Sequence, residues 1–132
     1  MFALDSNVLI YILERNETFF ESAQHALRVA LDSGKPICLS TLVLAEVLSG
    51  TADKQALEFL TASQFTLHDL SQDIAVLAGT LRFSHHSLRT PDAIHLATAL
   101  IAGARQFITN DDRLWKIDVG IEIVPLPKFM KG

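Results

Sequence analysis

The sequence predicts an α/β fold: one domain with a central parallel sheet of about five short strands, flanked by helices. Short apolar runs typical of strands alternate along the chain with longer stretches whose apolar residues recur every three or four positions, as on one face of a helix. Strands that are separated by helices usually pair in parallel. A length of 132 residues suffices for one hydrophobic core, so we take residues 1–132 as a single domain.

In the N-terminal half, short apolar runs predict strands at 2–4, 37–39 and 65–67. Helical periodicity between and after them predicts helices at 6–14, 18–32, 41–48 and 54–62. Cap and turn residues support these limits. Gly34 and Pro36 end the second helix, Thr41 is placed to cap the third, and Gly50 stops it.

In the C-terminal half, helices are predicted at 72–83 and 91–102, with a polar loop between them. Thr90 is expected to cap the second of these helices, and Pro91 fits its first position. Apolar runs predict the last strands, with a short helix between them; the strands lie at 106–108 and 122–124, and the helix at 113–116. In parallel sheets, ligands bind beyond the carboxyl ends of the strands, so the residues that follow the strands are the first functional candidates.

The composition excludes several classes of protein. With 49% hydrophobic and 20% charged residues, the chain has the profile of a folded globular protein. No apolar run reaches the roughly 18 residues that cross a bilayer, and the N-terminus has no basic stretch. We therefore expect no membrane span and no signal peptide, and a cytoplasmic protein. Cys38 is the only cysteine, which excludes an intrachain disulfide and a zinc finger and favours a small core residue.

Four acids stand inside or beside apolar sequence, where an unpaired carboxylate is costly to bury. They are Asp5, Glu46, Asp92 and Asp111. Acids placed against that cost, from four distant parts of one chain, suggest a single site in which they share a divalent cation. The net charge of −4 at first argues against a nucleic-acid partner. Because these four acids account for that whole charge, it does not exclude a nucleic-acid substrate recognised in a local groove.

Two of the four acids also have a structural explanation at the start of a helix. Asp5 directly precedes the helix at 6–14 and would stabilise it as a cap by about 1 kcal/mol. Asp92 falls in the first turn of the helix at 91–102, where the helix dipole favours an anion. Taken alone, Asp5 would favour capping over metal binding.

The other two acids differ in how well local structure explains them. Glu46 lies in a helix that is apolar nearly all round, so we expect it to be buried, and no Lys or Arg three or four residues away can pair with it. That favours a metal or a site cavity over the open alternative, a structural partner elsewhere in the chain. Asp111 follows Thr109 and Asn110 at a strand end, where turn chemistry also accounts for it. Asp112 is its open alternative, since spacing does not separate adjacent residues.

Four further side chains are secondary candidates. His95 shares a helix face with Asp92, but a partly buried structural histidine is the favoured interpretation. Arg82 and Arg89 lie on either side of the polar loop and are candidates for contact with RNA phosphates. Trp115 could stack on a base, although packing within the protein is the simpler expectation.

Four segments, in this order along the chain, resemble the motifs of the PIN-domain ribonuclease family and, within it, the small VapC-like toxins of bacterial type II toxin–antitoxin pairs. The segments are 4–10 (LDSNVLI), 44–50 (LAEVLSG), 90–97 (TPDAIHLA) and 107–111 (FITND). Each segment is a weak signal alone, whereas the ordered set is fairly specific and spans almost the whole chain. All four acidic positions are filled.

The resemblance implies a single PIN-like domain with a parallel sheet, and a Mg²⁺- or Mn²⁺-dependent endoribonuclease that hydrolyses RNA phosphodiester bonds. It also implies a homodimer and a cognate antitoxin protein. It assigns catalysis and metal binding to the four acids, Asp5, Glu46, Asp92 and Asp111. Ser6 and Asn110 match polar positions beside the first and the fourth acid and would support them.

Other functions stay open from the sequence. One is a PIN-like nuclease of RNA processing that has no antitoxin, and another is a non-catalytic binding module in which the acids act as caps or contact residues. A haloacid-dehalogenase-like phosphatase is disfavoured, because such enzymes need a second acid two residues after the first and this chain has Asn7 there.

Overall fold

A computed structural model describes residues 1–130 of the chain. Its sheet has five strands in the order β3-β2-β1-β4-β5, and every neighbouring pair is parallel. The strands are β1 (Phe2–Leu4), β2 (Ile37–Ser40), β3 (Phe65–His68), β4 (Gln106–Thr109) and β5 (Glu122–Pro125). The predicted α/β fold with a central parallel sheet is therefore confirmed.

Six α-helices and two short 3₁₀-helices connect and follow these strands within the described residues. The α-helices are α1 (Ser6–Leu13), α2 (Phe20–Asp32), α3 (Leu42–Leu48), α4 (Lys54–Leu60), α5 (Gln72–Ser84) and α6 (Thr90–Ala102). The 3₁₀-helices are η1 (Asp112–Leu114) and η2 (Leu126–Phe129). No helix in residues 1–130 is long and apolar enough to cross a membrane.

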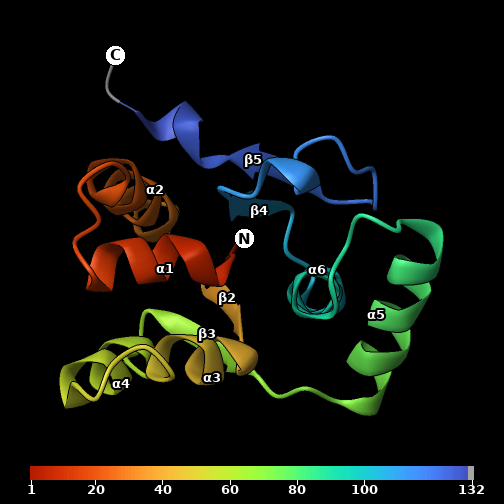
Figure 1. The fold of residues 1–132 in the computed structure, drawn as a ribbon, viewed down its shortest axis with the longest axis horizontal. Coiled ribbons are helices and arrows are strands. Elements are labelled where there is room, and N and C mark those ends of the chain that lie inside the picture. Colours follow the sequence, from red (N-terminus) through yellow and green to blue (C-terminus); the bar gives the residue numbers. More distant parts are fainter. Residues whose placement is uncertain (131–132) are drawn as a thin grey trace.

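Two hydrophobic clusters cover the two faces of the sheet. Successive side chains of a strand point to opposite faces, so Ala3 belongs to one cluster and Leu4 to the other. The Leu4 cluster contains the buried residues of α1 to α4, and the Ala3 cluster contains those of α5 and α6. Figure 1 shows this layering, with α5 and α6 on one side of the strands and α1 to α4 on the other.

Two predicted helix caps differ from the structure. Thr41 makes no capping hydrogen bond; instead the Ser40 hydroxyl accepts from the backbone N–H of Leu42 at 3.1 Å. Thr90 is not the cap of α6 but its first residue, and Arg89 occupies the cap position. At α3, Thr41 has the predicted position but another side chain makes the hydrogen bond. At α6, the helix begins one residue earlier than predicted, a difference that is common at helix ends.

Two predicted helix limits are also corrected. The helix predicted at 18–32 begins at Phe20, because the Asn16 side chain accepts hydrogen bonds from the N–H groups of Thr18 and Phe19 and holds that segment in a turn. The helix predicted at 113–116 is the 3₁₀ turn η1, which starts one residue earlier at Asp112. Cys38 is buried in β2 as predicted, and burial raises the pKa of its thiol to about 11.

Candidate active site

Asp5 lies where β1 ends and α1 begins, and its side chain is held on both oxygens. Oδ1 accepts from the backbone N–H of Ser6 at 2.8 Å, so Asp5 caps α1 as predicted. Oδ2 accepts from the hydroxyl of Thr109 at 2.7 Å. β1 and β4 are neighbours, and the Asp5 N–H still bonds the Ile108 carbonyl, so the two strands deliver Asp5 and Thr109 to the same edge of the sheet.

The surroundings of Asp5 disfavour its charge. The residue is only 4% exposed, and this burial is the main cause that raises the pKa of its carboxyl. The negative charge of Asp92 adds to the rise, while His95 and the hydrogen bonds from Thr109 and Ser6 oppose it. Asp5 is therefore a buried carboxyl group that is hydrogen-bonded on both oxygens and whose charged form is disfavoured mainly by burial.

Asp111 follows β4 on the same edge, and an arginine that sequence reasoning missed neutralises it. The Arg113 guanidinium donates from Nε to Asp111 Oδ1 at 2.9 Å, and from Nη2 to Asp111 Oδ2. These hydrogen bonds are the main reason that the pKa of Asp111 is lowered. Asp112 is exposed in η1, whereas Asp111 points its carboxylate into this ion pair, so the geometry favours Asp111 of the two.

Asp92 joins the same cluster from the first turn of α6. Its Oδ2 accepts from Arg113 Nη2 at 3.3 Å and from the backbone N–H of Arg89 at 3.0 Å. The second bond secures the start of α6, so Asp92 has the structural role that the sequence suggested. The first bond connects it to Asp111 through a shared guanidinium. Asp92 and Asp111, 19 positions apart in sequence, thus face the same positive charge.

Glu46 belongs to a second pair at this site. Its Oε1 lies 2.5 Å from Nε2 of His95, and the contact between α3 and α6 brings them together although 49 positions separate them. His95 is buried, as a structural histidine would be, but it is also a direct neighbour of a candidate acid. Burial opposes its protonation, yet the Glu46 hydrogen bond and the negative charge of Asp5 raise the pKa of His95.

The expectation that Glu46 is buried is wrong. Its side chain is 29% exposed, because the buried face of α3 is formed by Val43 and Val47 and Glu46 lies beside it. Its partner is His95 of α6, a structural partner elsewhere in the chain, which the sequence had left open. Nδ1 of His95 is buried and has no hydrogen-bond partner among the described residues.

Thr109 connects Asp5 with the segment that carries Asp111. Besides donating to Asp5, its hydroxyl accepts from the Asp111 N–H at 3.0 Å. Asn7 adds a longer contact, from its amide nitrogen to the same hydroxyl at 3.5 Å. Thr109 is fully buried. Thr109 could have been found from the sequence by its position, because it ends β4 and the neighbouring strand β1 is followed directly by Asp5.

Ser6 and Asn110, the two residues expected to support the acids, do so through contacts that the sequence did not show. Ser6 acts on Asp5 through its backbone N–H. Asn110 donates from its side chain to the hydroxyl of Tyr11 at 2.9 Å, and its backbone N–H bonds Asn7 Oδ1. Both therefore brace the segments that carry Asp5 and Asp111.

The two loop arginines have different surroundings. Arg82 donates from Nε to the Leu88 carbonyl and from Nη1 to the Thr90 hydroxyl, each at 3.0 Å. It therefore ties the loop to α6. Arg89 lies closer to the acids, since its charge helps to lower the pKa of Asp111. Trp115 donates from its indole N–H to the Thr109 carbonyl at 3.1 Å, which fits a packing role.

The donor set of this site suits a hard divalent cation, which prefers carboxylate oxygens. Asp92 and Asp111 share the Arg113 guanidinium, whereas Asp5 makes no ion pair among the described residues, and only the charge of His95 acts on it. Within residues 1–130, no three Asp, Glu, His or Cys side chains converge closely enough to form a complete metal-binding group as they stand. In its chemistry the set of carboxylates fits a divalent ion, and the Arg113 guanidinium contacts two of them, Asp92 and Asp111.

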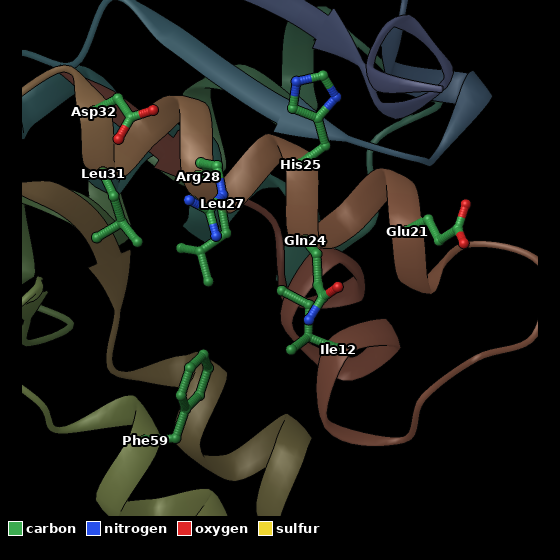
Figure 2. A pocket seen from close by; sticks show the side chains of 9 residues that line it. All are labelled: Ile12, Glu21, Gln24, His25, Leu27, Arg28, Leu31, Asp32 and Phe59. Atoms are coloured by element: carbon green, nitrogen blue, oxygen red, sulfur yellow. The ribbon is translucent and has the colours of Figure 1, made fainter. Parts of the chain in front are cut away.

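A cavity of about 760 Å³ lies elsewhere, between α2 and α4, and none of the four acids lines it. Figure 2 shows Phe59 of α4 facing Leu27 and Leu31 of α2 across the opening. Charged side chains of α2, including Glu21 and Asp32, also line it. The acids at the edge of the sheet and this groove are thus separate features of the molecule.

Comparisons with known proteins identify the family and the fold. The family model of the PIN domain matches residues 2–120. A toxin–antitoxin complex from Klebsiella pneumoniae contains a chain with 26% sequence identity and a TM-score of 0.73, with 96% of this chain and 98% of that chain covered. A comparison with curated proteins finds no match.

Two further solved structures have the same fold at lower identity. VapBC2 from Rickettsia felis, bound to a DNA fragment from its promoter, has 21% identity and a TM-score of 0.70 over 94% of this chain and 97% of that one. DNA-bound VapBC from Salmonella typhimurium has 22% identity and a TM-score of 0.69, over 95% and 97%.

Proposed function

This chain belongs to the PIN domain family, and from that premise we propose that it is a divalent-metal-dependent endoribonuclease, the toxin of a toxin–antitoxin pair. One observation carries the catalytic part. Three acids from separate segments, Asp5, Asp92 and Asp111, gather at one edge of the sheet, and Asp5 there is buried with a raised pKa. An acid that is held in a site which disfavours its charge is a candidate functional group.

Mg²⁺ or Mn²⁺ is the cofactor we propose, held by Asp5, Glu46, Asp92 and Asp111. When bound, such an ion lowers the pKa of a water molecule for attack on the phosphodiester and stabilises the leaving oxygen. Asp5 is pre-positioned for this by Thr109 and Ser6. His95 fixes the orientation of Glu46 through the bond from Nε2.

Recognition of the RNA backbone would fall to cations at the rim of the site. Arg89 is the stronger of the two loop candidates, because its charge already acts on Asp111. Arg82 is occupied with Leu88 and Thr90, so its role would be to hold the loop that carries Arg89. Phosphate contacts of this kind position a substrate without reading its sequence.

The test is cleavage of a labelled, structured RNA by the purified chain with Mg²⁺, with Mn²⁺ and with EDTA. We expect cleavage that EDTA abolishes and that falls by at least about 100-fold in Asp5→Asn and in Asp92→Asn, since loss of even a supporting group at a metal site costs 10- to 100-fold. Asp118→Asn is the matched control, because Asp118 is exposed in the loop before β5. Full cleavage by both site variants, with circular dichroism showing them folded, would exclude the assignment.

The partner and the assembly are part of the same proposal. The similar solved structures are toxin–antitoxin complexes, which supports a cognate antitoxin for this chain. A homodimer that acts in the cytoplasm completes the proposal. Induced expression in a bacterium without the antitoxin should stop growth, and Asp5→Asn should relieve that arrest. Size-exclusion chromatography with light scattering should give about twice the 14.5 kDa of one chain. Growth that is unaffected by the wild-type chain at confirmed expression would favour an RNA-processing role.

A further inference from the structure

The Arg113 side chain places a positive charge where the carboxylates of Asp92 and Asp111 meet. It contacts both oxygens of Asp111 and Oδ2 of Asp92. Local structure explains why: Asp111 caps η1 by accepting from the Arg113 backbone N–H at 3.1 Å, and this turn folds the arginine side chain back over the acid. Planar guanidinium groups match carboxylates in this paired geometry.

The oxygens that Arg113 contacts are the ones a divalent ion would need. A metal ion bound by Asp92 and Asp111 would take at least one carboxylate oxygen from each, and Arg113 already contacts both oxygens of Asp111 and Oδ2 of Asp92. Two positive groups in the same small space repel each other. Arg113 and a divalent ion therefore exclude each other at this end of the site.

The Arg113 side chain is more exposed to solvent than the two acids that it contacts. It is 34% exposed, against 13% for Asp92 and 19% for Asp111. Arginine has a long and flexible stem, so the guanidinium can turn into solvent without disturbing the core. Asp5, by contrast, is held on both oxygens by buried groups.

We propose that Arg113 is a built-in competitor of the metal ion: its guanidinium occupies the cation position between Asp92 and Asp111 and must leave it when a divalent ion binds. This rests on the proposed metal site but adds a residue that opposes metal binding. Its consequence is a weakened apparent affinity. If Arg113 occupies the position nine-tenths of the time, the apparent dissociation constant rises about tenfold.

The test is the affinity of the whole chain for Mn²⁺ alone, measured by isothermal titration calorimetry in wild type, Arg113→Gln and Arg113→Lys. Arg113→Gln should bind Mn²⁺ about tenfold more tightly, and Arg113→Lys, which keeps the charge but not the paired hydrogen bonds, should fall between it and wild type. The melting temperature gives a second readout: added Mn²⁺ should raise it more in Arg113→Gln than in wild type. Arg105→Gln removes the same charge from an exposed position before β4, at the opposite end of the sheet, and should match wild type.

Unchanged or weaker Mn²⁺ binding by Arg113→Gln would overturn the proposal and make Arg113 a group that positions the acids. If Arg113→Gln fails to fold, Arg113→Lys decides by the same comparison. Tighter binding by Arg113→Gln without RNA cleavage by any variant would uphold the competitor and overturn the nuclease. Absence of Mn²⁺ binding in wild type and in both Arg113 variants would overturn both proposals.

Discussion

Asp5 and Asp111 lie at the same edge of the sheet, after neighbouring strands, yet the protein treats their charges in opposite ways. Asp5 is buried, and its pKa is raised mainly by burial. Asp111 is partly exposed and paired with Arg113, which lowers its pKa. Arg113 thus pairs with the acid at one end of the site, while burial disfavours the charge of the acid at the other end. If the proposed metal site is correct, an incoming cation would gain most at Asp5 and would meet competition at Asp111.

The largest expected effect separates Asp111 from its neighbour. Asp111→Asn should reduce Mg²⁺-dependent RNA cleavage by at least about 100-fold, because it removes one of the converging carboxylates. Asp112→Asn should leave cleavage within about twofold of wild type, because Asp112 is exposed in η1. Initial cleavage rates measured side by side decide between them. The reverse pattern would assign the fourth acid to Asp112 and break the comparison between Asp5 and Asp111.

A smaller effect is expected where the two ends of the site are joined. Thr109→Val removes the hydroxyl that donates to Asp5 and accepts from the Asp111 N–H while keeping the shape of the side chain. The free energy of unfolding should fall by about 1–3 kcal/mol, since a buried N–H and a buried carboxylate each lose a partner. RNA cleavage should fall by about tenfold.

Thr109→Ser is the control for that substitution, because it keeps the hydroxyl and loses only a methyl group. It should retain most of the cleavage activity, and urea denaturation should show a loss of about 1 kcal/mol. Equal losses of activity in the two variants would mean that packing at Thr109, and not its hydrogen bonds, supports the site.

The smallest effect concerns the dependence of stability on pH in metal-free buffer. Asp111 has a pKa below its usual 3.8. Its ionised form therefore adds to the free energy of unfolding above pH 3.8, and this stabilisation is lost as the pH falls through the lowered pKa. Asp5 has a pKa above 3.8. Its protonated form therefore adds to the free energy of unfolding fully below pH 3.8, and this stabilisation is lost as the pH rises through the raised pKa.

The two asparagine variants should therefore change the pH profile in opposite directions. Relative to wild type, Asp5→Asn should gain most stability at pH 7 and lose that advantage as the pH falls towards 3.8. Asp111→Asn should be most destabilised at pH 7 and approach wild type below 3.8. Free energies of unfolding in urea at several pH values check this. Parallel profiles for the two variants would show that Asp5 and Asp111 share one electrostatic environment.

The sequence predicted the secondary structure well where the pattern is local. Alternating apolar runs and helical stretches were sufficient for the parallel α/β fold. Helix caps at Thr41 and Thr90 were less well predicted, since several polar residues at a helix start can serve as caps and the path of the preceding chain selects one. The prediction that Glu46 is buried was wrong because a helix that is apolar nearly all round does not reveal which face packs on the core; Val43 and Val47 form that face.

The sequence by itself determined that Asp5 follows a strand and caps a helix, and that Asp92 lies in a first helical turn, because hydrogen bonds within a few residues decide both positions. Only the tertiary structure decided which groups surround them. The strand order places Thr109 beside Asp5, and the contact of α3 with α6 brings His95 to Glu46. The fold of η1 turns Arg113 towards two acids. Charge and burial depend on neighbours in space, and distances along the chain do not specify those neighbours.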